Sequence, residues 1–142
     1  ILPSYCTYYH NHIFGRVSEP KLAGLQVNPQ HYTVLLAEIS CNFNDEIWNN
    51  SEKLIDDTCR ELEEEKLLAR DDVKEIHILK ERFAYPIFDL DYEENIEKIR
   101  AYLSGFNNVY STGRQGAFEY VNSHRAIKMG FEIADIIKEV TP

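Results

Sequence analysis

The feature that most constrains this fold is a pair of strand-like segments near the N-terminus with no helical pattern between them. Residues Tyr8 to Val17 are rich in aromatic and β-branched side chains, which favour an extended backbone. Residues His31 to Ser40 have a nearly apolar centre, which is typical of a strand inside a sheet. Parallel neighbours need a long crossover, usually a helix. The pair therefore argues against a doubly wound parallel sheet.

Apolar side chains at helical spacing predict three helices farther along the chain. The first is expected to be capped by Asn50 or Ser51 and to run to about Lys66, and the second is expected to run from 92 to 104. Ser123 is expected to cap the third, over 124–140, because its hydroxyl can accept from an unpaired N–H group. That last helix is apolar on most of its circumference, so we expect it to be buried against other structure on several sides.

Two further strands are predicted, over 73–85 and 108–111, followed by an irregular crossing over 113–121. The order β–β–α–β–α–β–α indicates an α+β fold with a mostly antiparallel sheet and about three helices.

Composition excludes several classes of protein. The net charge of −9 argues against nucleic acid as a partner, because phosphate binding needs clustered basic side chains. No apolar run approaches the roughly 20 residues of a membrane span. The three cysteines are widely spaced and odd in number, which favours reduced thiols in a cytoplasmic protein.

The segment before the last helix carries the strongest chemical signal. Gly113 and Gly116 permit a close backbone approach to a ligand, and Arg114 offers a planar fork of donors to a phosphate or carboxylate. Asn122, Ser123 and His124 stand at a helix N-terminus, which attracts negative charge. The alternative interpretation is a glycine-rich connection with a surface arginine.

Four more residues are candidates for contact with a substrate: Arg16, Tyr85, Phe118 and Tyr120. Each also fits an ordinary exposed or core position. His10 and His12 could share one face of a strand, but no third ligand lies near them in the sequence, so no metal site is expected. The sequence singles out no catalytic residue.

The closing segment resembles the C-terminal signature of FAD-dependent amine-oxidase and protoporphyrinogen-oxidase-like flavoproteins, and its motif is most similar to that of UDP-galactopyranose mutase and its relatives. The positions on that pattern are Gly113, Arg114, Gly116, Phe118, Tyr120 and Ile127. Asn122, Ser123 and His124 depart from the Asp-Met-Asp that is usual in the mutases. Weaker similarity to bacterial amine-oxidase-like proteins covers nearly the whole chain, including 83–86 and 14–20.

The resemblance implies a C-terminal part of a two-domain flavoprotein. The Gly-x-Gly-x-x-Gly fingerprint of dinucleotide binding is absent, so an FAD-binding domain is expected upstream; a first residue Ile1 instead of Met fits this. Residues 1–106 would belong to the substrate-binding sheet and its helices, and residues 107–142 would return to the FAD-binding domain.

The implied activity is either oxidation of an amine or porphyrinogen-type substrate, or rearrangement of a nucleotide sugar. The chain alone is not expected to retain FAD. The alternative function is a stand-alone acidic α+β interaction module without catalysis. In either case, the apolar last helix could support a homodimer.

Overall fold

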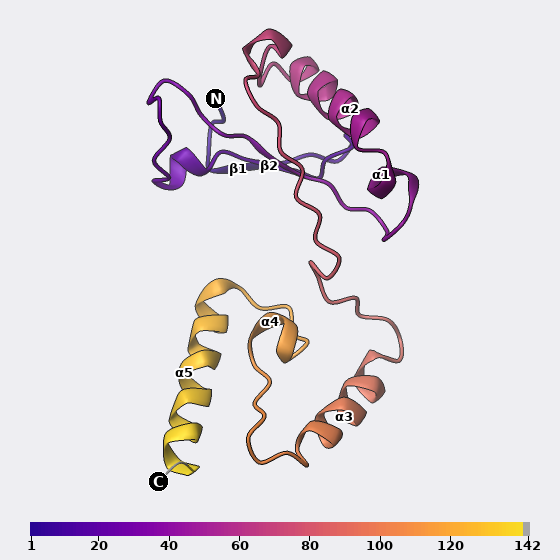
Figure 1. The fold of residues 1–142 in the computed structure, drawn as a ribbon, viewed down its shortest axis with the longest axis vertical. Coiled ribbons are helices and arrows are strands. Elements are labelled where there is room, and N and C mark those ends of the chain that lie inside the picture. The colour runs from indigo at the N-terminus through magenta and orange to yellow at the C-terminus, as the bar shows by residue number, and fades with distance from the viewer. Residues whose placement is uncertain (141–142) are drawn as a thin grey trace. The chain divides into compact units, whose positions relative to one another are not determined.

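The computed structural model describes residues 1–140 and shows a small α+β fold (Figure 1). The chain forms two compact units, of which the first is Ile1–Lys80 and the second begins at Glu81. The division falls before residue 106, so the second unit includes the helix predicted over 92–104 as well as the glycine-rich segment.

The first unit contains a three-stranded antiparallel sheet in the order β1-β2-β3. Its strands are β1 (Cys6–Tyr8), β2 (Arg16–Ser18) and β3 (Leu36–Glu38). Val17 lies at the centre of the register, opposite Thr7 on one side and Ala37 on the other. The antiparallel sheet predicted from the sequence is therefore confirmed.

The strand boundaries differ from the prediction. The prediction of a single strand over 8–17 is wrong. The chain reverses within this range, and the Tyr9 N–H donates to the Gly15 carbonyl at 2.9 Å. Only Leu36–Glu38 of the expected strand 31–40 enters the ladder, and it lies at an edge of the sheet. The central strand β2 has three residues, so no more than three residues of β3 can pair with it.

The other predicted strands, over 73–85 and 108–111, are also wrong, since neither segment joins a ladder. Both carry side chains that favour strands, but a strand exists only where a neighbour supplies hydrogen-bond partners.

The first unit also contains a short helix α1 (Glu46–Asn49), the longer α2 (Ser51–Glu64) and two 3-10 turns, Pro20–Ala23 and Arg70–Asp72. The Asn50 side chain accepts from the Lys53 N–H at 3.2 Å, so the predicted cap of α2 is confirmed. Trp48 lies within α1, and its ring contacts Phe43.

The core of the first unit lies between the sheet and α2, which covers one face of the sheet (Figure 1). Phe14 and Val17 are fully buried, and Leu62 reaches them from α2. The predicted apolar stripe of α2 thus faces the sheet, with Cys59 and Leu62 buried. Burial of these side chains attaches the helix to the hairpin.

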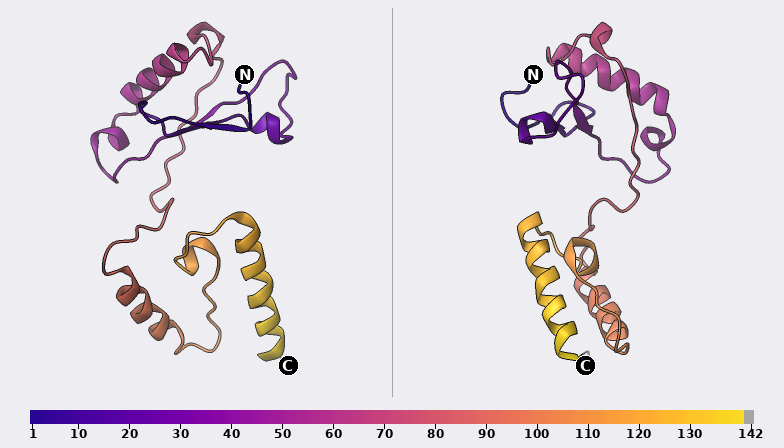
Figure 2. Two further views of the ribbon diagram at one scale, coloured as in Figure 1. Left: turned by 180° about the vertical axis from the view of Figure 1, so that it is seen from behind. Right: turned by 60° about the vertical axis from the view of Figure 1, so that its left-hand side comes forward.

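The second unit contains α3 (Tyr92–Leu103), α4 (Gly113–Gly116) and α5 (Ser123–Val140), and α4 lies near the start of α5 (Figure 2). The two long helices are confirmed, but Ser123 is the first helical residue rather than the cap. The Asn122 carbonyl instead accepts the first helical bonds, from Arg125 and Ala126, both at 3.0 Å. Among residues 1–140, no helix is both long and apolar enough to span a lipid bilayer.

Phe14→Ala is expected to destabilise the first unit by about 3–5 kcal/mol, because it leaves a cavity beneath α2. Trp48, the single tryptophan, lies in this unit, so its fluorescence during urea unfolding reports the change. Leu25→Ala is the control, since Leu25 is 51% exposed. An equal effect of the two substitutions would contradict the assigned core.

A second prediction concerns pH. Glu19 is buried and accepts from the Leu2 N–H at 2.7 Å and from the Thr33 hydroxyl at 2.8 Å. Burial raises the pKa of Glu19, but the hydrogen bonds that the carboxylate accepts outweigh this effect and lower that pKa below the ordinary value. Because the pKa is lowered on folding, ionised Glu19 stabilises the fold at pH values above the pKa of an unfolded glutamate, about 4.3. This contribution to the free energy of unfolding is lost as the pH falls through the pKa of Glu19 in the folded protein.

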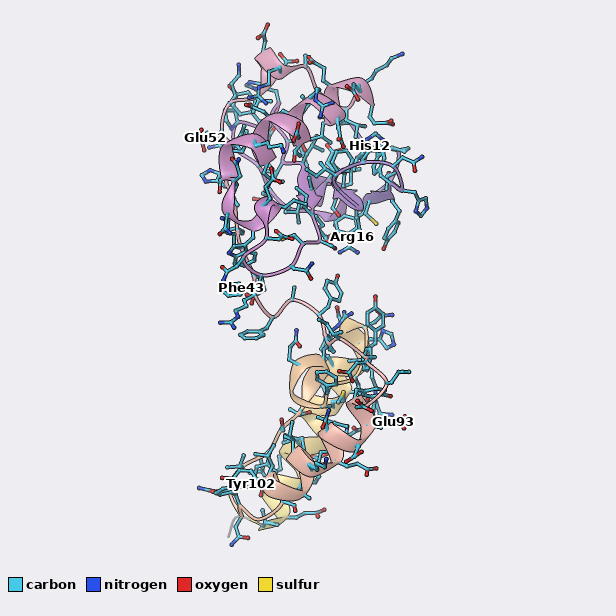
Figure 3. The ribbon with its side chains drawn as sticks, turned by 90° about the vertical axis from the view of Figure 1, so that its right-hand side faces the viewer. His12, Arg16, Phe43, Glu52, Glu93 and Tyr102 are labelled. Atoms are coloured by element: carbon cyan, nitrogen blue, oxygen red, sulfur yellow. The ribbon has the colours of Figure 1, made fainter. Side chains whose placement is uncertain are left out.

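Glu19→Gln is therefore expected to lower the urea midpoint at pH 7 and to flatten its decline between about pH 5 and pH 3. Glu52→Gln, at an exposed position of α2, is the control and should leave the acid limb nearly unchanged (Figure 3). An unaltered pH profile in the Glu19 variant would refute this role.

Candidate functional site

The glycine-rich segment forms a single helical turn, α4, instead of the irregular crossing predicted for it. Its backbone is closed by bonds from the Ala117 N–H to the Gly113 carbonyl at 2.9 Å and from the Glu119 N–H to the Arg114 carbonyl at 3.1 Å. Arg100 of α3 donates to the Ala117 carbonyl at 2.7 Å. The turn is thereby attached to α3, and Arg114 has a fixed backbone.

Arg114 lies against two tyrosine rings. Its guanidinium carbon is 4.7 Å from the centre of the Tyr85 ring and 4.1 Å from that of Tyr120. The two rings are 6.4 Å apart and inclined by 23°. The electron-rich faces of the rings attract the cation. We call these three residues the arginine cage.

The arginine cage leaves donors unused. Nε and Nη2 of Arg114 are shielded from solvent, and neither has a hydrogen-bond partner among residues 1–140. A buried donor without a partner costs free energy, and ring faces compensate for only part of that cost. Such a guanidinium is suited to an anion that brings two acceptors, such as a phosphate or carboxylate.

Gln115 places Tyr85 in the arginine cage. Its side-chain amide donates to the carbonyls of Phe83 and Ala84, at 2.8 and 3.0 Å. The segment that carries Tyr85 is thus attached to α4 from 31 and 32 residues away in the chain. Gln115 is not among the residues predicted from the sequence, and nothing in its local pattern marks it.

The two glycines of the turn serve different purposes. Gly113 has φ +76°, in the left-handed region, and a Cβ added there would meet nothing within 4 Å. The backbone beside Gly113 is therefore open to a ligand. At Gly116 an added Cβ would lie 2.9 Å from the Ser111 hydroxyl, which donates to the Gly116 carbonyl. Packing within the chain thus accounts for Gly116 without a ligand.

The predicted anion-binding end of the last helix begins at Ser123, three residues after Tyr120. The backbone N–H groups of Ser123 and His124 have no acceptor within the described part of the chain. These groups and the partial positive charge of an 18-residue helix favour a negative group at this end.

Phe118 lies two residues after the end of α4, with φ +53°. Its ring packs against Phe88 and Tyr92, at centroid distances of 5.5 and 6.3 Å. It lines an open hollow of about 390 Å³ beside α3, together with Tyr92, Glu93, Ile96, Glu97, Arg100 and Glu119. Desolvation, followed by the charge of Glu93, raises the pKa of the Tyr92 hydroxyl. Phe118 therefore belongs to an aromatic cluster outside the arginine cage.

Arg16 lies in the first unit, on β2 (Figure 3). Its guanidinium donates to Glu38 through Nε at 2.8 Å and through Nη2 at 2.6 Å, and also to the Tyr8 hydroxyl at 3.2 Å. The side-chain bond to Glu38, followed by the one to Tyr8, raises the pKa of Arg16 above its already high ordinary value. A substrate phosphate would compete with Glu38 for this arginine.

His12 lies in the hairpin loop and meets two carboxylates, one on α2 and one on the residue directly after it (Figure 3). Its ring nitrogens are 3.3 Å from Glu61 and 3.1 Å from Glu65, and its ring stacks on Phe14. The carboxylates stand about 50 residues away in the sequence, so local reasoning could not find them. His10 is exposed in the same loop rather than on a strand. Residues 1–140 contain no group of three or more His, Cys, Asp or Glu suited to a metal ion.

Comparison of the chain with family models, with curated proteins and with solved structures found no match.

Gln115→Glu is expected to free the segment 83–85, because a carboxylate cannot donate to two carbonyls. The loss is about 1–3 kcal/mol of local stability, with faster amide exchange at 83–85. Glu97→Gln is the matched control, since the Glu97 side chain is exposed and makes no hydrogen bond within residues 1–140. Unchanged exchange in the Gln115 variant would contradict the role of this side chain.

Proposed function

We propose that this chain is the C-terminal part of an FAD-dependent flavoprotein of the amine-oxidase and UDP-galactopyranose-mutase type. The carrying observation is the arginine cage. It holds Arg114 with two unsatisfied donors nine residues before the first residue of α5, whose N-terminus also has free N–H groups. The residues present fit an anionic cofactor: Gly113 leaves open backbone on the same turn, and the donors suit phosphate or an electron-rich ring.

In this proposal, each group has a distinct role. The N–H groups of Ser123 and His124, with Asn122 as the cap, face negative charge on the flavin ring. Arg114 binds a phosphate of the cofactor or a charged group of the substrate. Tyr85 and Tyr120 hold the guanidinium and border the substrate, and Phe118 supports the turn. FAD, when bound, would accept a hydride from an amine or act as a nucleophile toward a nucleotide sugar.

The proposal also assigns parts of the chain. Residues 1–106 contribute to a substrate-binding sheet and its helices, and residues 107–142 reach the FAD-binding domain, which lies upstream in the same polypeptide. Part of α5 is then covered by that domain. This accounts for a helix in which Met129 is buried while Ile127 and Phe131 are 61% and 68% exposed. Cys6, Cys41 and Cys59 are free thiols, in keeping with a cytoplasmic protein.

Arg114→Ala in the full-length flavoprotein is expected to weaken binding of FAD or of a charged substrate by about 10- to 100-fold, since hydrogen bonds to a charged group contribute about 1.5–3 kcal/mol. Flavin absorbance and fluorescence titration measure the change. Arg125→Ala is the matched control, because Arg125 is paired with Glu132 on the exposed side of α5.

Unchanged affinity for both ligands in the Arg114 variant would remove its assigned role. Chain 1–142 alone should be colourless when purified, because it lacks the dinucleotide-binding fingerprint. Near-stoichiometric bound flavin in that preparation would contradict the proposal that FAD binds mainly to an upstream domain.

The exposed apolar residues of α5 favour a second candidate function, a non-catalytic interaction module that binds a protein partner or a second copy through this helix. Phe131→Glu should then abolish the association seen in sedimentation. Under the flavoprotein proposal, the same substitution should instead loosen FAD binding in the full-length protein.

A further inference from the structure

The donors of Arg114 that lack a partner are also closed to solvent. Nε and Nη2 are shielded from water, and neither donates to any group in residues 1–140. A ligand forms a hydrogen bond only with a donor that it can touch, so an anion in solution reaches neither nitrogen while the arginine cage keeps this arrangement. A movement within the cage must therefore accompany anion binding at Arg114.

The Tyr120 ring is the nearer of the two rings to the guanidinium. Its centre is 4.1 Å from the guanidinium carbon, compared with 4.7 Å for Tyr85. Nε and Nη2 are both bonded to that carbon, so a ring at this distance lies against them. Tyr120 is also the more exposed of the two tyrosines, at 68% against 51% for Tyr85. A ring with so much of its surface in water loses little packing when it turns away.

The two tyrosines differ in how firmly they are held. Gln115 donates to the carbonyls of the two residues before Tyr85 and so attaches that segment to α4. The hydroxyl and the backbone N–H of Tyr120, by contrast, have no hydrogen-bond partner in the described chain. Tyr85 is therefore the fixed wall of the cage, and Tyr120 is the wall that is free to move.

The third nitrogen of the guanidinium offers an anion its first contact. Nη1 is not among the shielded atoms of Arg114, and it makes no hydrogen bond within residues 1–140. Its positive charge attracts an anion while the cage is still closed. Hydrogen bonds from Nε and Nη2 to a charged acceptor are stronger than contact with a ring face, so the anion then replaces Tyr120 at these donors.

We infer that the Tyr120 ring is a lid over Arg114. It covers Nε and Nη2 when no anion is bound, and it moves off them when an anionic group with two acceptor oxygens binds. This inference rests on the proposed role of Arg114 in anion binding and adds a closed state from which the site must open. Because only the open fraction of molecules binds, the lid lowers the apparent affinity of the site.

The test is an NMR titration of chain 1–142 with inorganic pyrophosphate, followed at the Arg114 Nε–H resonance. Tyr120→Leu removes the ring and should tighten binding about tenfold, because the closed state no longer competes with the anion. Tyr120→Phe keeps the ring without its hydroxyl and should stay within about twofold of the wild type. Tyr102→Leu is the matched control and should not change the affinity, since Tyr102 is 70% exposed on α3 and lies outside the arginine cage (Figure 3).

Two further readouts locate the movement. Tyr120→Leu and added pyrophosphate should each move the Arg114 Nε–H resonance in the same direction, because both remove the ring from the guanidinium. Nuclear Overhauser contacts from the Arg114 side chain to the Tyr85 ring should persist with pyrophosphate, whereas those to the Tyr120 ring should disappear. Arg114→Lys in the Tyr120→Leu background should cancel the gain in affinity, because lysine lacks the planar fork of donors.

Three results would overturn the inference. The first is unchanged or weaker pyrophosphate binding by Tyr120→Leu, which would make the ring part of the anion site instead of its cover. The second is loss of both ring contacts on binding, which would show that Arg114 leaves the cage. The third is absence of pyrophosphate binding in every variant, which would remove the anion role of Arg114 itself.

Failure of the flavin proposal alone would look different. Pyrophosphate would still bind to chain 1–142 and would still displace the Tyr120 ring, while the affinity of the full-length protein for FAD would not depend on Arg114.

Discussion

Each compact unit of this chain is too short to bury the apolar residues that it carries. In units of this size, a large share of the side chains must lie at the surface. Burial is concentrated where two elements meet, at Phe14 and Val17 beneath Leu62 of α2. Elsewhere, long aliphatic and aromatic side chains stay exposed, including Leu79 and Phe131. This shortage of covering chain determines which surfaces are available for binding.

The arginine cage shows how the second unit holds a functional side chain with little core. α4 is a single turn, yet Arg100 attaches it to α3 and Gln115 attaches it to the segment that carries Tyr85. Hydrogen bonds to backbone carbonyls thus take the place of extensive packing. They place Arg114 between two rings while leaving two of its nitrogens unpaired, an arrangement that makes sense if an anion completes it.

Two parts of the surface have one physical feature in common. The N-terminus of α5 and the segment 74–80 both display backbone groups that the described chain does not satisfy, one as helix donors and the other as a strand edge. Helix donors favour a compact negative group, whereas a strand edge favours another strand.

The sequence by itself determined the α+β class, the antiparallel sheet and the long helices, because helical periodicity and caps such as Asn50 act within a few residues. It also singled out Arg114, Tyr85 and Tyr120 separately. Only the tertiary structure decided that these three meet, that Glu61 and Glu65 reach His12, and that 73–85 has no sheet partner. The reason is that strand pairing and cage formation depend on residues tens of positions apart, and no local pattern records whether a partner is present.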